Sequence, residues 1–185
     1  MYLQKAIQKG YHLSDSIRQG DIHMVGDGST ILVGIDFSYC SGLALKKACE
    51  FLDGKGGQII ALHVVDESFI KKCTEHRFGN EADIKKELFL EAKSKLKNFV
   101  RRATKGIQCS SIQLSVTQGI PYIEINKKAV EFDADMIIIG SCAKDSDMDN
   151  IFFGSTAERV LRFITRPVLC VPPEFDLKIS RKHIN

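Results

Sequence analysis

Short apolar runs rich in β-branched residues alternate with longer amphipathic stretches along most of this chain, and this alternation limits the possible folds more than any other feature. Parallel strands cannot be joined by tight turns, so each pair needs a crossover, usually a helix. The expected strands are Ile31–Ile35, Gln58–Val65, Ile112–Thr117, Met136–Ile139 and Val168–Val171. The expected helices are Ser41–Leu52, Glu81–Thr104, one that begins at Pro121, and Ser155–Ile164. The sequence therefore predicts an α/β fold with the order βαβαβαβαβ.

The expected strands differ in how much of their surface should be buried. The first, second, fourth and fifth are nearly all apolar, as in strands covered by helices on both faces. The third alternates apolar and polar residues over Ile112–Val116, which indicates an edge strand with one solvated face. In the last helix we expect Val160, Leu161 and Ile164 to be buried, and we expect Val65–Asn80 to be a mobile connection.

Length and charge define the domain organisation and exclude some partners. The 185 residues, 44% of them hydrophobic, suit one globular domain. We expect an extension over residues 1–30, the α/β domain over 31–173, and a polar tail over 174–185. The net charge of +3, with both signs interleaved, argues against nucleic acid and acidic membranes as partners. Because no signal peptide and no apolar run of ~20 residues is found, we expect a cytoplasmic protein without a membrane segment.

The six cysteines give no sign of a metal site. They are scattered, without a Cys-x-x-Cys pair and without cysteine and histidine at the spacing of zinc ligands. We therefore expect reduced thiols. Cys142 follows the turn at Gly140 and Ser141, where it is either incidental or exposed to oxidants.

Two strand ends carry the residues of an expected anion site. Asp36 follows the first strand, and Gly140 ends the fourth. Further on, Gly154 and Ser155 open a helix whose first turn offers unpaired N–H groups and the positive end of the dipole. Ser155 and Glu158 also have the spacing of a capping box, which accounts for both side chains by helix capping alone. Capping and phosphate binding are compatible at this position.

Five segments resemble the universal stress protein family in content, order and spacing. They are Ile31–Ser38, Ala61–Glu67, Asp135–Ser141, Gly154–Glu158 and Arg166–Pro172. The resemblance covers roughly residues 31 to 173. It implies an open five-stranded parallel sheet in the order 3-2-1-4-5, with helices on both faces, as in adenine-nucleotide α-hydrolase-like folds. It also implies a homodimer formed through the last strand, and a ligand crevice between strands one and four.

The resemblance also implies roles for individual residues. In the ATP-binding branch of the family, a signature Gly-x2-Gly-x9-Gly-Ser/Thr holds ribose and phosphates, and the matching positions here are Gly140, Gly154, Ser155 and Thr156. Asp36 and the backbone of Val64 would face adenine and its ribose, with Gly34 beneath them. The chain departs from the signature at Ala143, which replaces the middle glycine, and its connecting loop is one residue longer.

Simpler interpretations stand beside these roles. Asp36 either contacts the ribose or helps to cap the following helix through the turn at Phe37 and Ser38. Gly140 either approaches a phosphate or only ends a strand. We expect His63, inside an apolar strand, to be a packed and satisfied histidine and not a catalytic one.

The loop after Ala143 is unusually acidic for a neighbour of a phosphate site. It carries Asp145, Asp147 and Asp149. Carboxylates there either bridge Mg²⁺ to phosphate oxygens or form an ordinary solvated turn.

Three functions from different classes fit these observations. The favoured one is a homodimeric stress-response or signalling module that binds an adenine nucleotide, with ATP as the first choice of ligand. One form of this hypothesis includes Mg²⁺ bound together with the nucleotide. The alternatives are a nucleotide-free dimeric scaffold that binds partner proteins, and a slow ATP hydrolase. A dedicated enzyme is not expected, because the sequence contains no Walker lysine motif and no Gly-x-Ser-x-Gly elbow.

Overall fold

One parallel sheet organises the molecule. The computed structural model describes residues 26–76, 80–109, 111–142 and 154–173. Its five strands lie in the order β3-β2-β1-β4-β5, which confirms the expected topology. They are β1 (Thr30–Gly34), β2 (Gln58–Asp66), β3 (Ser111–Gly119), β4 (Met136–Gly140) and β5 (Val168–Val171). Most of the expected N-terminal extension and the expected polar tail lie outside the described residues, so the domain boundaries stay predictions.

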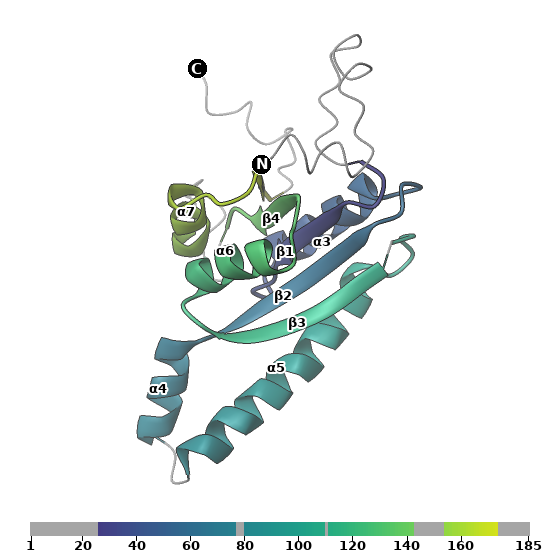
Figure 1. The fold of residues 1–185 in the computed structure, drawn as a ribbon. Coiled ribbons are helices and arrows are strands. Elements are labelled where there is room, and N and C mark those ends of the chain that lie inside the picture. The colour runs from purple at the N-terminus through teal and green to yellow at the C-terminus, as the bar shows by residue number, and fades with distance from the viewer. Residues whose placement is uncertain (1–25, 77–79, 110, 143–153, 174–185) are drawn as a thin grey trace, which may run out of the picture.

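Helices cover both faces of the sheet. They are α3 (Tyr39–Phe51), α4 (Glu67–His76), α5 (Glu81–Ala103), α6 (Pro121–Glu131) and α7 (Ser155–Arg162). Figure 1 shows α3 and α5 on one face and α6 and α7 on the other. A doubly wound sheet of this kind follows from right-handed crossovers that leave the strands in opposite directions.

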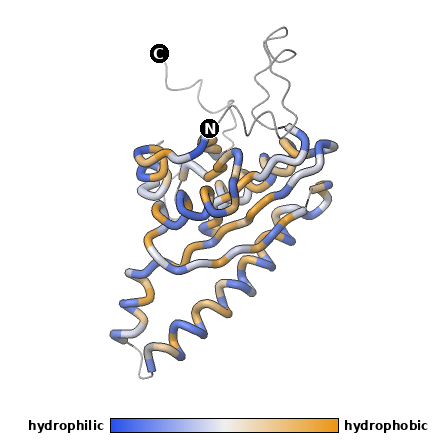
Figure 2. The backbone as a smooth tube through the Cα atoms, in the orientation of Figure 1, coloured by the Kyte–Doolittle hydropathy of each residue, from blue (hydrophilic) through white to orange (hydrophobic). Residues whose placement is uncertain are grey.

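The core consists of two clusters, one on each side of the central strands. Alternation along a strand sends Ile31 and Val33 towards α3 and α5, and Leu32 towards α6 and α7. All three side chains are fully buried. Figure 2 shows the hydrophobic colour along the central strands, while α5 alternates between hydrophobic and hydrophilic along its turns. The sheet centre is therefore a rigid base for the loops at its carboxyl edge.

The two edge strands are less buried than the centre. β3 is exposed or half-buried throughout, as the alternating sequence predicted. All four residues of β5 are half-buried, so the expectation that this strand is covered on both faces is wrong. Its position at the other edge of the sheet accounts for the difference.

The segment expected to be a mobile connection is largely regular structure. β2 continues to Asp66, whose Oδ1 accepts hydrogen bonds from the Ser68 N–H at 2.7 Å and from Ser68 Oγ at 2.6 Å. This turn starts α4, and Ile70 is buried against Val65 and Ile84. The prediction was wrong because α4 is short and mostly polar, so its apolar spacing is weak.

The start of α7 also differs from expectation. Gly154 is the N-cap residue, Ser155 is the first helical residue, and no side chain caps the helix within the described residues. Glu158 accepts from Arg162 Nη2 at 2.9 Å, so the predicted capping box is wrong. Val160 is fully buried as expected, but α7 ends at Arg162 and Ile164 is 58% exposed, so the expected burial of Ile164 is wrong.

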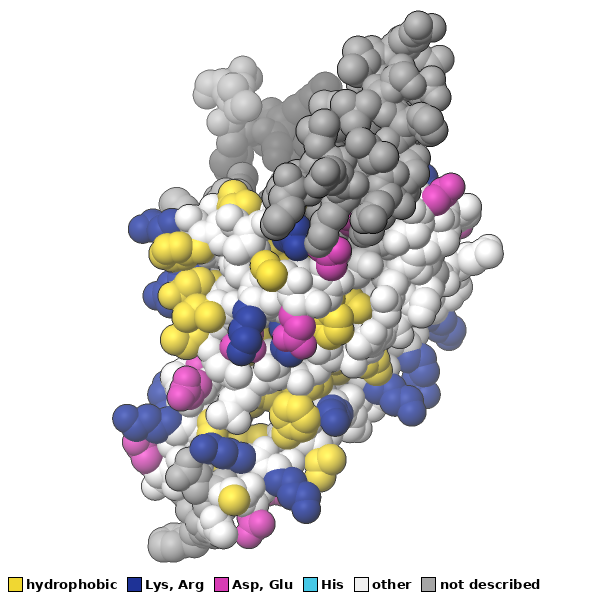
Figure 3. All heavy atoms as spheres, viewed as in Figure 1, with side chains coloured by type: hydrophobic (Ala, Val, Ile, Leu, Met, Phe, Trp, Pro, Cys, Tyr) yellow, Lys and Arg dark blue, Asp and Glu magenta, His cyan; other side chains and the backbone are white. Residues whose placement is uncertain are grey.

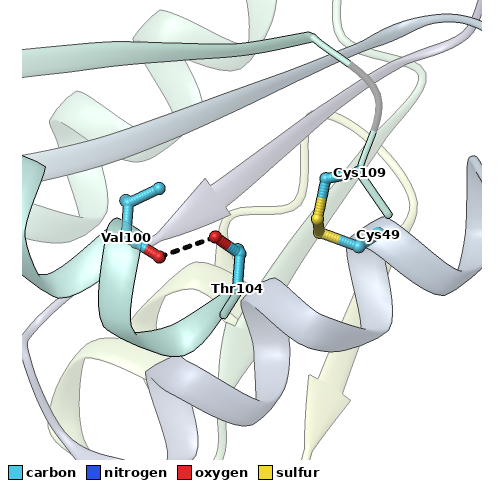
Figure 4. Close-up of a disulfide and its surroundings, with 4 residues drawn as sticks. All are labelled: Cys49, Val100, Thr104 and Cys109. Carbon is cyan, nitrogen blue, oxygen red and sulfur yellow. Dashed lines mark hydrogen bonds between the residues drawn. A yellow bond between two sulfur atoms is a disulfide. The ribbon is translucent and has the colours of Figure 1, made fainter. Parts of the chain in front are cut away.

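One pair of cysteines forms a disulfide. Cys49, in α3, is bonded to Cys109, which lies just before β3, with a Cα–Cα distance of 4.9 Å (Figure 4). The expectation of reduced thiols is wrong for these two residues. Their separation of 60 residues left no spacing motif in the sequence. The bond fastens α3 to the chain that enters the edge strand.

The surface carries charges of both signs. On the face seen in Figure 3, Lys and Arg side chains stand among Asp and Glu side chains. Several oppositely charged neighbours pair along a helix, such as Lys128 with Glu131 at 2.8 Å. None of the helices within the described ranges has the length and apolarity needed to cross a bilayer.

Candidate functional site

A cavity lies where the chain leaves β1 and β4 in opposite directions. β1 leads to α3 on one face of the sheet, and β4 leads towards α7 on the other. Open α/β sheets bind ligands at this kind of switch point, at the carboxyl ends of the strands. The volume is about 120 Å³, and the lining residues are Gly34, Ile35, Asp36, Ser41, Leu62, His63, Val64, Pro121, Ile139, Gly140, Thr156 and Ala157.

The structure brings together most of the residues singled out from the sequence. Those that line this cavity are Gly34, Asp36, Val64, Gly140 and Thr156. Ser155 lines an adjoining hollow, and Gly154 lies half-buried at the start of α7. Ala143 falls outside the described residues.

The turn after β1 turns Asp36 outwards and Phe37 inwards. Phe37 has a φ of 67°, which is uncommon for a residue with a side chain, and its ring centroid lies 4.2 Å from that of His63. The Lys95 Nζ lies 4.5 Å from the centroid of the Phe37 ring. Backbone strain of this kind persists only where packing imposes it, and it is common at binding sites.

Asp36 orders the turn, whereas Ser38 caps the helix. Asp36 is exposed, and its Oδ1 accepts from the Ser38 N–H at 2.9 Å. Ser38 Oγ accepts from the Ser41 N–H at 3.1 Å as the N-cap of α3. Asp36 therefore does not cap α3 itself, but it orders the turn that carries the N-cap residue Ser38. Its carboxylate stands at the rim of the cavity.

The backbone of Val64 presents a donor and an acceptor to the cavity. The Ile35 N–H donates to the Leu62 carbonyl at 2.8 Å, so Leu62 turns its backbone polar groups towards β1. Val64, two residues on, turns the same way, but the pairing of β1 with β2 ends at Gly34 and Leu62. The exocyclic amine and ring nitrogens of adenine offer the complementary pair.

His63 is a packed histidine, as predicted. Its Nδ1 lies 2.7 Å from the Ile35 carbonyl oxygen, so Nδ1–H donates to that oxygen. Burial lowers the pKa of His63, and the Lys95 charge lowers it further, against the opposing effects of the Ile35 carbonyl and the Asp36 carboxylate. The ring is therefore neutral at pH 7, and it supports the floor of the site.

The lowered pKa of His63 predicts a loss of stability in mild acid. Above the unfolded-state pKa of about 6.5 the ring is neutral in both states. As the pH falls below 6.5, the unfolded chain takes up the proton first, so the free energy of unfolding decreases until the folded state is protonated too. In His63→Asn the amide can still donate to the Ile35 carbonyl, but it cannot titrate.

Urea denaturation of both proteins at pH 7.5, 6.5 and 5.5 tests this expectation. Wild type should lose more stability than His63→Asn between the last two pH values. Parallel losses in the two proteins would contradict it, since the carboxylates that titrate in this range are shared by both.

The glycine side of the cavity is built by close backbone packing. A Cβ at Gly140 would lie 2.7 Å from the Cys40 carbonyl carbon and 2.7 Å from the Cys40 Cβ. The Ser141 N–H donates to the Val171 carbonyl at 2.9 Å, and the Gly154 N–H donates to the Ser141 carbonyl at 2.8 Å. Gly140 therefore allows α3 to rest on β4, and Ser141 brings the start of α7 to the same edge.

A second hollow adjoins the cavity at the start of α7. Its volume is about 380 Å³, and Pro121 and Thr156 line both spaces. The remaining residues that line it are Asp66, Glu67, Ser68, Ile120, Tyr122, Ser155 and Arg159. The first turn of α7 contributes N–H groups that no side chain among the described residues caps.

Arg159 is a residue of this hollow that the sequence analysis missed. Its guanidinium lies 5.6 Å from the centre of the Tyr122 ring. Arg159 comes four positions after Ser155, so both lie on one side of α7. That spacing from the Gly-Ser-Thr segment was the signal that could have revealed it. The hollow is therefore lined by a cationic side chain, Arg159, and by the carboxylates of Asp66 and Glu67.

The magnesium hypothesis is not tested by the described part of the chain. Asp145, Asp147 and Asp149 lie outside it. Among the described residues, no group of three or more His, Cys, Asp or Glu side chains is arranged to hold a metal ion.

Known proteins are similar to this chain in both sequence and fold. The family model of the universal stress protein family matches residues 29–172. Universal stress protein MJ0577 of Methanocaldococcus jannaschii is 34% identical over 156 residues, which cover 76% of this chain and 93% of the relative. The solved structure of MJ0577 superposes with a TM-score of 0.66 at 33% identity, over 80% of this chain and 97% of that one.

Two solved structures with the same fold contain a nucleotide. A universal stress protein in complex with cAMP has a TM-score of 0.52 at 18% identity, over 80% of this chain and 98% of that chain. The Archaeoglobus fulgidus protein in complex with dAMP has a TM-score of 0.50 at 21% identity, over 80% of this chain and 99% of that chain. At these identities the likeness shows the fold alone. On the family match and the MJ0577 identity, the chain belongs to the universal stress protein family.

Proposed function

We propose that this protein is a stress-response module that binds an adenine nucleotide, ATP first. The observation that carries the proposal is the junction of two spaces at the switch point of the sheet. One offers the Asp36 carboxylate and the Val64 backbone, and the other offers the first turn of α7 with Arg159. The two spaces meet at Pro121 and Thr156.

The chemistry of each space suits one end of ATP. The base and ribose would lie at the cavity above Gly34, with Asp36 accepting from a ribose hydroxyl and Val64 facing the adenine edge. The phosphates would lie over the α7 N-terminus, near Ser155, where backbone N–H groups and the helix dipole favour anions. Asp66 and Glu67, across the same hollow, suit a Mg²⁺ ion carried in with the phosphates.

The relatives support the proposal only at the level of the fold. The cAMP and dAMP complexes show that a sheet of this kind can hold an adenine nucleotide. The case for ATP in this chain rests on its own residues at the switch point.

A homodimer through β5 is part of the same proposal. All four residues of β5 are half-buried, and Phe163 and Ile164, just before it, are 55% and 58% exposed. A second copy that pairs along this edge would bury apolar surface and satisfy the strand's free edge. We place the dimer in the cytoplasm, although disulfides such as Cys49–Cys109 are uncommon in most cytosolic proteins.

Sedimentation velocity with ATP and Mg²⁺ tests binding and assembly together. Free ATP barely sediments, so its absorbance moves with the protein only when it is bound, and the same boundary gives the mass of the species. We expect ATP to move with a dimer. In Asp36→Ala we expect about a tenfold weaker affinity, which corresponds to the loss of one charge-assisted hydrogen bond.

Asp135→Ala is the matched control. Asp135 Oδ2 accepts from the Thr30 N–H at 2.9 Å, so this variant also loses a carboxylate bonded to the backbone, but before the first residue of β4 and away from the cavity. It should bind ATP like wild type. ATP that stays behind the wild-type boundary at high micromolar protein would refute the proposal.

A nucleotide-free scaffold is the second candidate, and the size of the cavity favours it. The space at the strand ends is about 120 Å³, below the ~300 Å³ at the lower end of small-molecule sites. A nucleotide therefore has to use the second hollow as well. The scaffold predicts a melting temperature indifferent to ATP, because a ligand that binds only the folded state must raise it.

A further inference from the structure

Two cysteines outside the disulfide meet where α3 begins above the end of β4. Cys40 lies in the first turn of α3 and is 4% exposed, and Cys142 lies two residues after β4 and is half-buried. The backbone around Cys40 is so close to Gly140 that a Cβ there would lie 2.9 Å from the Ser41 nitrogen. The two chain segments that carry these thiols are therefore in direct contact.

The backbone after β4 holds the residues around Cys142 next to α3. The Ser141 N–H donates to the Val171 carbonyl at 2.9 Å, and the chain bends at Ser141 and Cys142. Gly140, two residues before Cys142, packs against Cys40 itself, since a Cβ at Gly140 would lie 2.7 Å from the Cys40 Cβ. The Cys142 Sγ lies 3.5 Å from Ser141 Oγ.

The electrostatics of Cys40 agree with this placement. Burial raises the pKa of the Cys40 thiol, the backbone N–H of Cys142 acts in the opposite direction, and the Cys142 thiol adds to the increase. The Cys142 N–H and Sγ both act on the same sulfur only when the two thiols are neighbours.

We propose that Cys40 and Cys142 are a redox-active pair that closes to a second, reversible disulfide when the protein meets a low-molecular-weight disulfide such as oxidised glutathione. The Cys142 thiolate attacks one sulfur of the small disulfide, whose S–S bond breaks and releases one thiol. The Cys40 thiolate then attacks Sγ of Cys142 and expels the second thiol. Two protein thiols are oxidised, the small disulfide is reduced to two thiols, and the two protein protons end on these leaving groups.

Exposure assigns the order of the two steps. Cys142 is half-buried and can be reached by a small disulfide, whereas Cys40 is nearly inaccessible. Burial also disfavours the thiolate of Cys40. Cys142 is therefore the attacking residue and Cys40 the resolving one.

The bond would act on the candidate nucleotide site, and this step rests on the proposed function. Ser41 and Gly140 line the cavity, and each is close in sequence to one of the two cysteines. Drawing Cys142 towards α3 strains the hydrogen bond from Gly154 to the Ser141 carbonyl, which holds the start of α7. We expect about fivefold weaker ATP binding by the oxidised protein, a size typical of coupling between sites.

Peptide mapping after incubation with oxidised glutathione tests the pair without any nucleotide. Trypsin places Cys40 and Cys142 in separate peptides, which end at Lys46 and Lys144, and neither contains another cysteine. Wild type should yield the cross-linked pair of peptides, and dithiothreitol should release them. In Cys40→Ser the glutathione should stay on Cys142 as a trapped mixed disulfide.

Two further variants complete the experiment. Cys142→Ser should leave Cys40 unmodified, and Cys170→Ser, a change on the outer strand, should behave like wild type. Wild type that gives only glutathionylated Cys142, or a bond from Cys142 to Cys170, would overturn the proposal. If the cross-link forms while ATP binding is absent in both redox states, the pair stands and the proposed function fails.

Discussion

Gly140→Ala is expected to lower the free energy of unfolding by about 3 kcal/mol, the upper range for overpacking in a tight interior. The added methyl group would lie 2.7 Å from the Cys40 carbonyl carbon and 2.9 Å from the Ser41 nitrogen. Both are backbone atoms of α3, so no side-chain rotation relieves the contact. Either α3 lifts from β4 or the end of β4 bends away.

Gly42→Ala is the matched control in the same helix. Its Cβ would meet Phe99 Cζ at 3.7 Å, which is ordinary van der Waals contact. Because alanine favours a helix interior over glycine, this variant should gain up to about 1 kcal/mol. Urea denaturation of the three proteins gives the comparison. Equal stability of Gly140→Ala and wild type would mean that α3 and β4 are not in backbone contact.

Gly140 also shows how one residue serves both the fold and the proposed site. The sequence offered two interpretations, a close approach to phosphate and a simple strand end. The structure adds a third reason, which is the close packing of the α3 backbone against Gly140. This contact requires glycine whether or not a ligand binds. Gly140→Ala should therefore lose stability and ATP affinity together, whereas Asp36→Ala should lose affinity and little stability.

The regular part of the fold could be predicted because periodicity reports burial. β1 and β4 are nearly all apolar since helices cover both faces, and β3 alternates since one side is open. The boundaries of α5 came within one residue of the structure for the same reason, its long amphipathic pattern. Strand order, in contrast, was available only from the resemblance to a family.

Features set by contacts distant in sequence could not be predicted. The Cys49–Cys109 bond joins residues 60 positions apart, and nothing local marks them as partners. The N-cap of α7 is Gly154 because its N–H is tied to the Ser141 carbonyl, a tertiary contact that shifts the helix start away from the expected capping box. α4 was missed because it is short and mostly polar, and its buried Ile70 packs on Val65 of β2 and on α5, which are contacts that local spacing does not reveal.

The candidate site was partly visible in the sequence. Asp36, Gly140 and Thr156 were singled out as strand-end and helix-start residues, and topology brings them to one cavity. Arg159 was missed because a charged residue one helical turn further on looks like any solvated position. Only the structure shows that Arg159 lies over the ring of Tyr122, a residue of α6, and so belongs to the hollow.

The disulfide between Cys49 and Cys109 is expected to contribute about 4 kcal/mol to stability, from the entropy of a closed loop of this length in the unfolded chain. It links the last turns of α3 to the residues that lead into β3. β3 is the edge strand beside β2, and it is the most exposed strand of the sheet. Reduction should therefore lower the urea midpoint of wild type substantially. Loosening should begin at β3, whose edge position leaves it least protected.

The double variant Cys49→Ala, Cys109→Ala separates the bond from its side effects. Cys49 is fully buried, so a serine there would add the cost of an unpaired hydroxyl, which alanine avoids. Denaturation with and without dithiothreitol should show a large shift for wild type and none for the double variant. The Cys142→Ser background removes any contribution from the second cysteine pair. A wild-type midpoint that dithiothreitol leaves unchanged, with reduction confirmed by thiol titration, would show that packing alone holds α3 against β3.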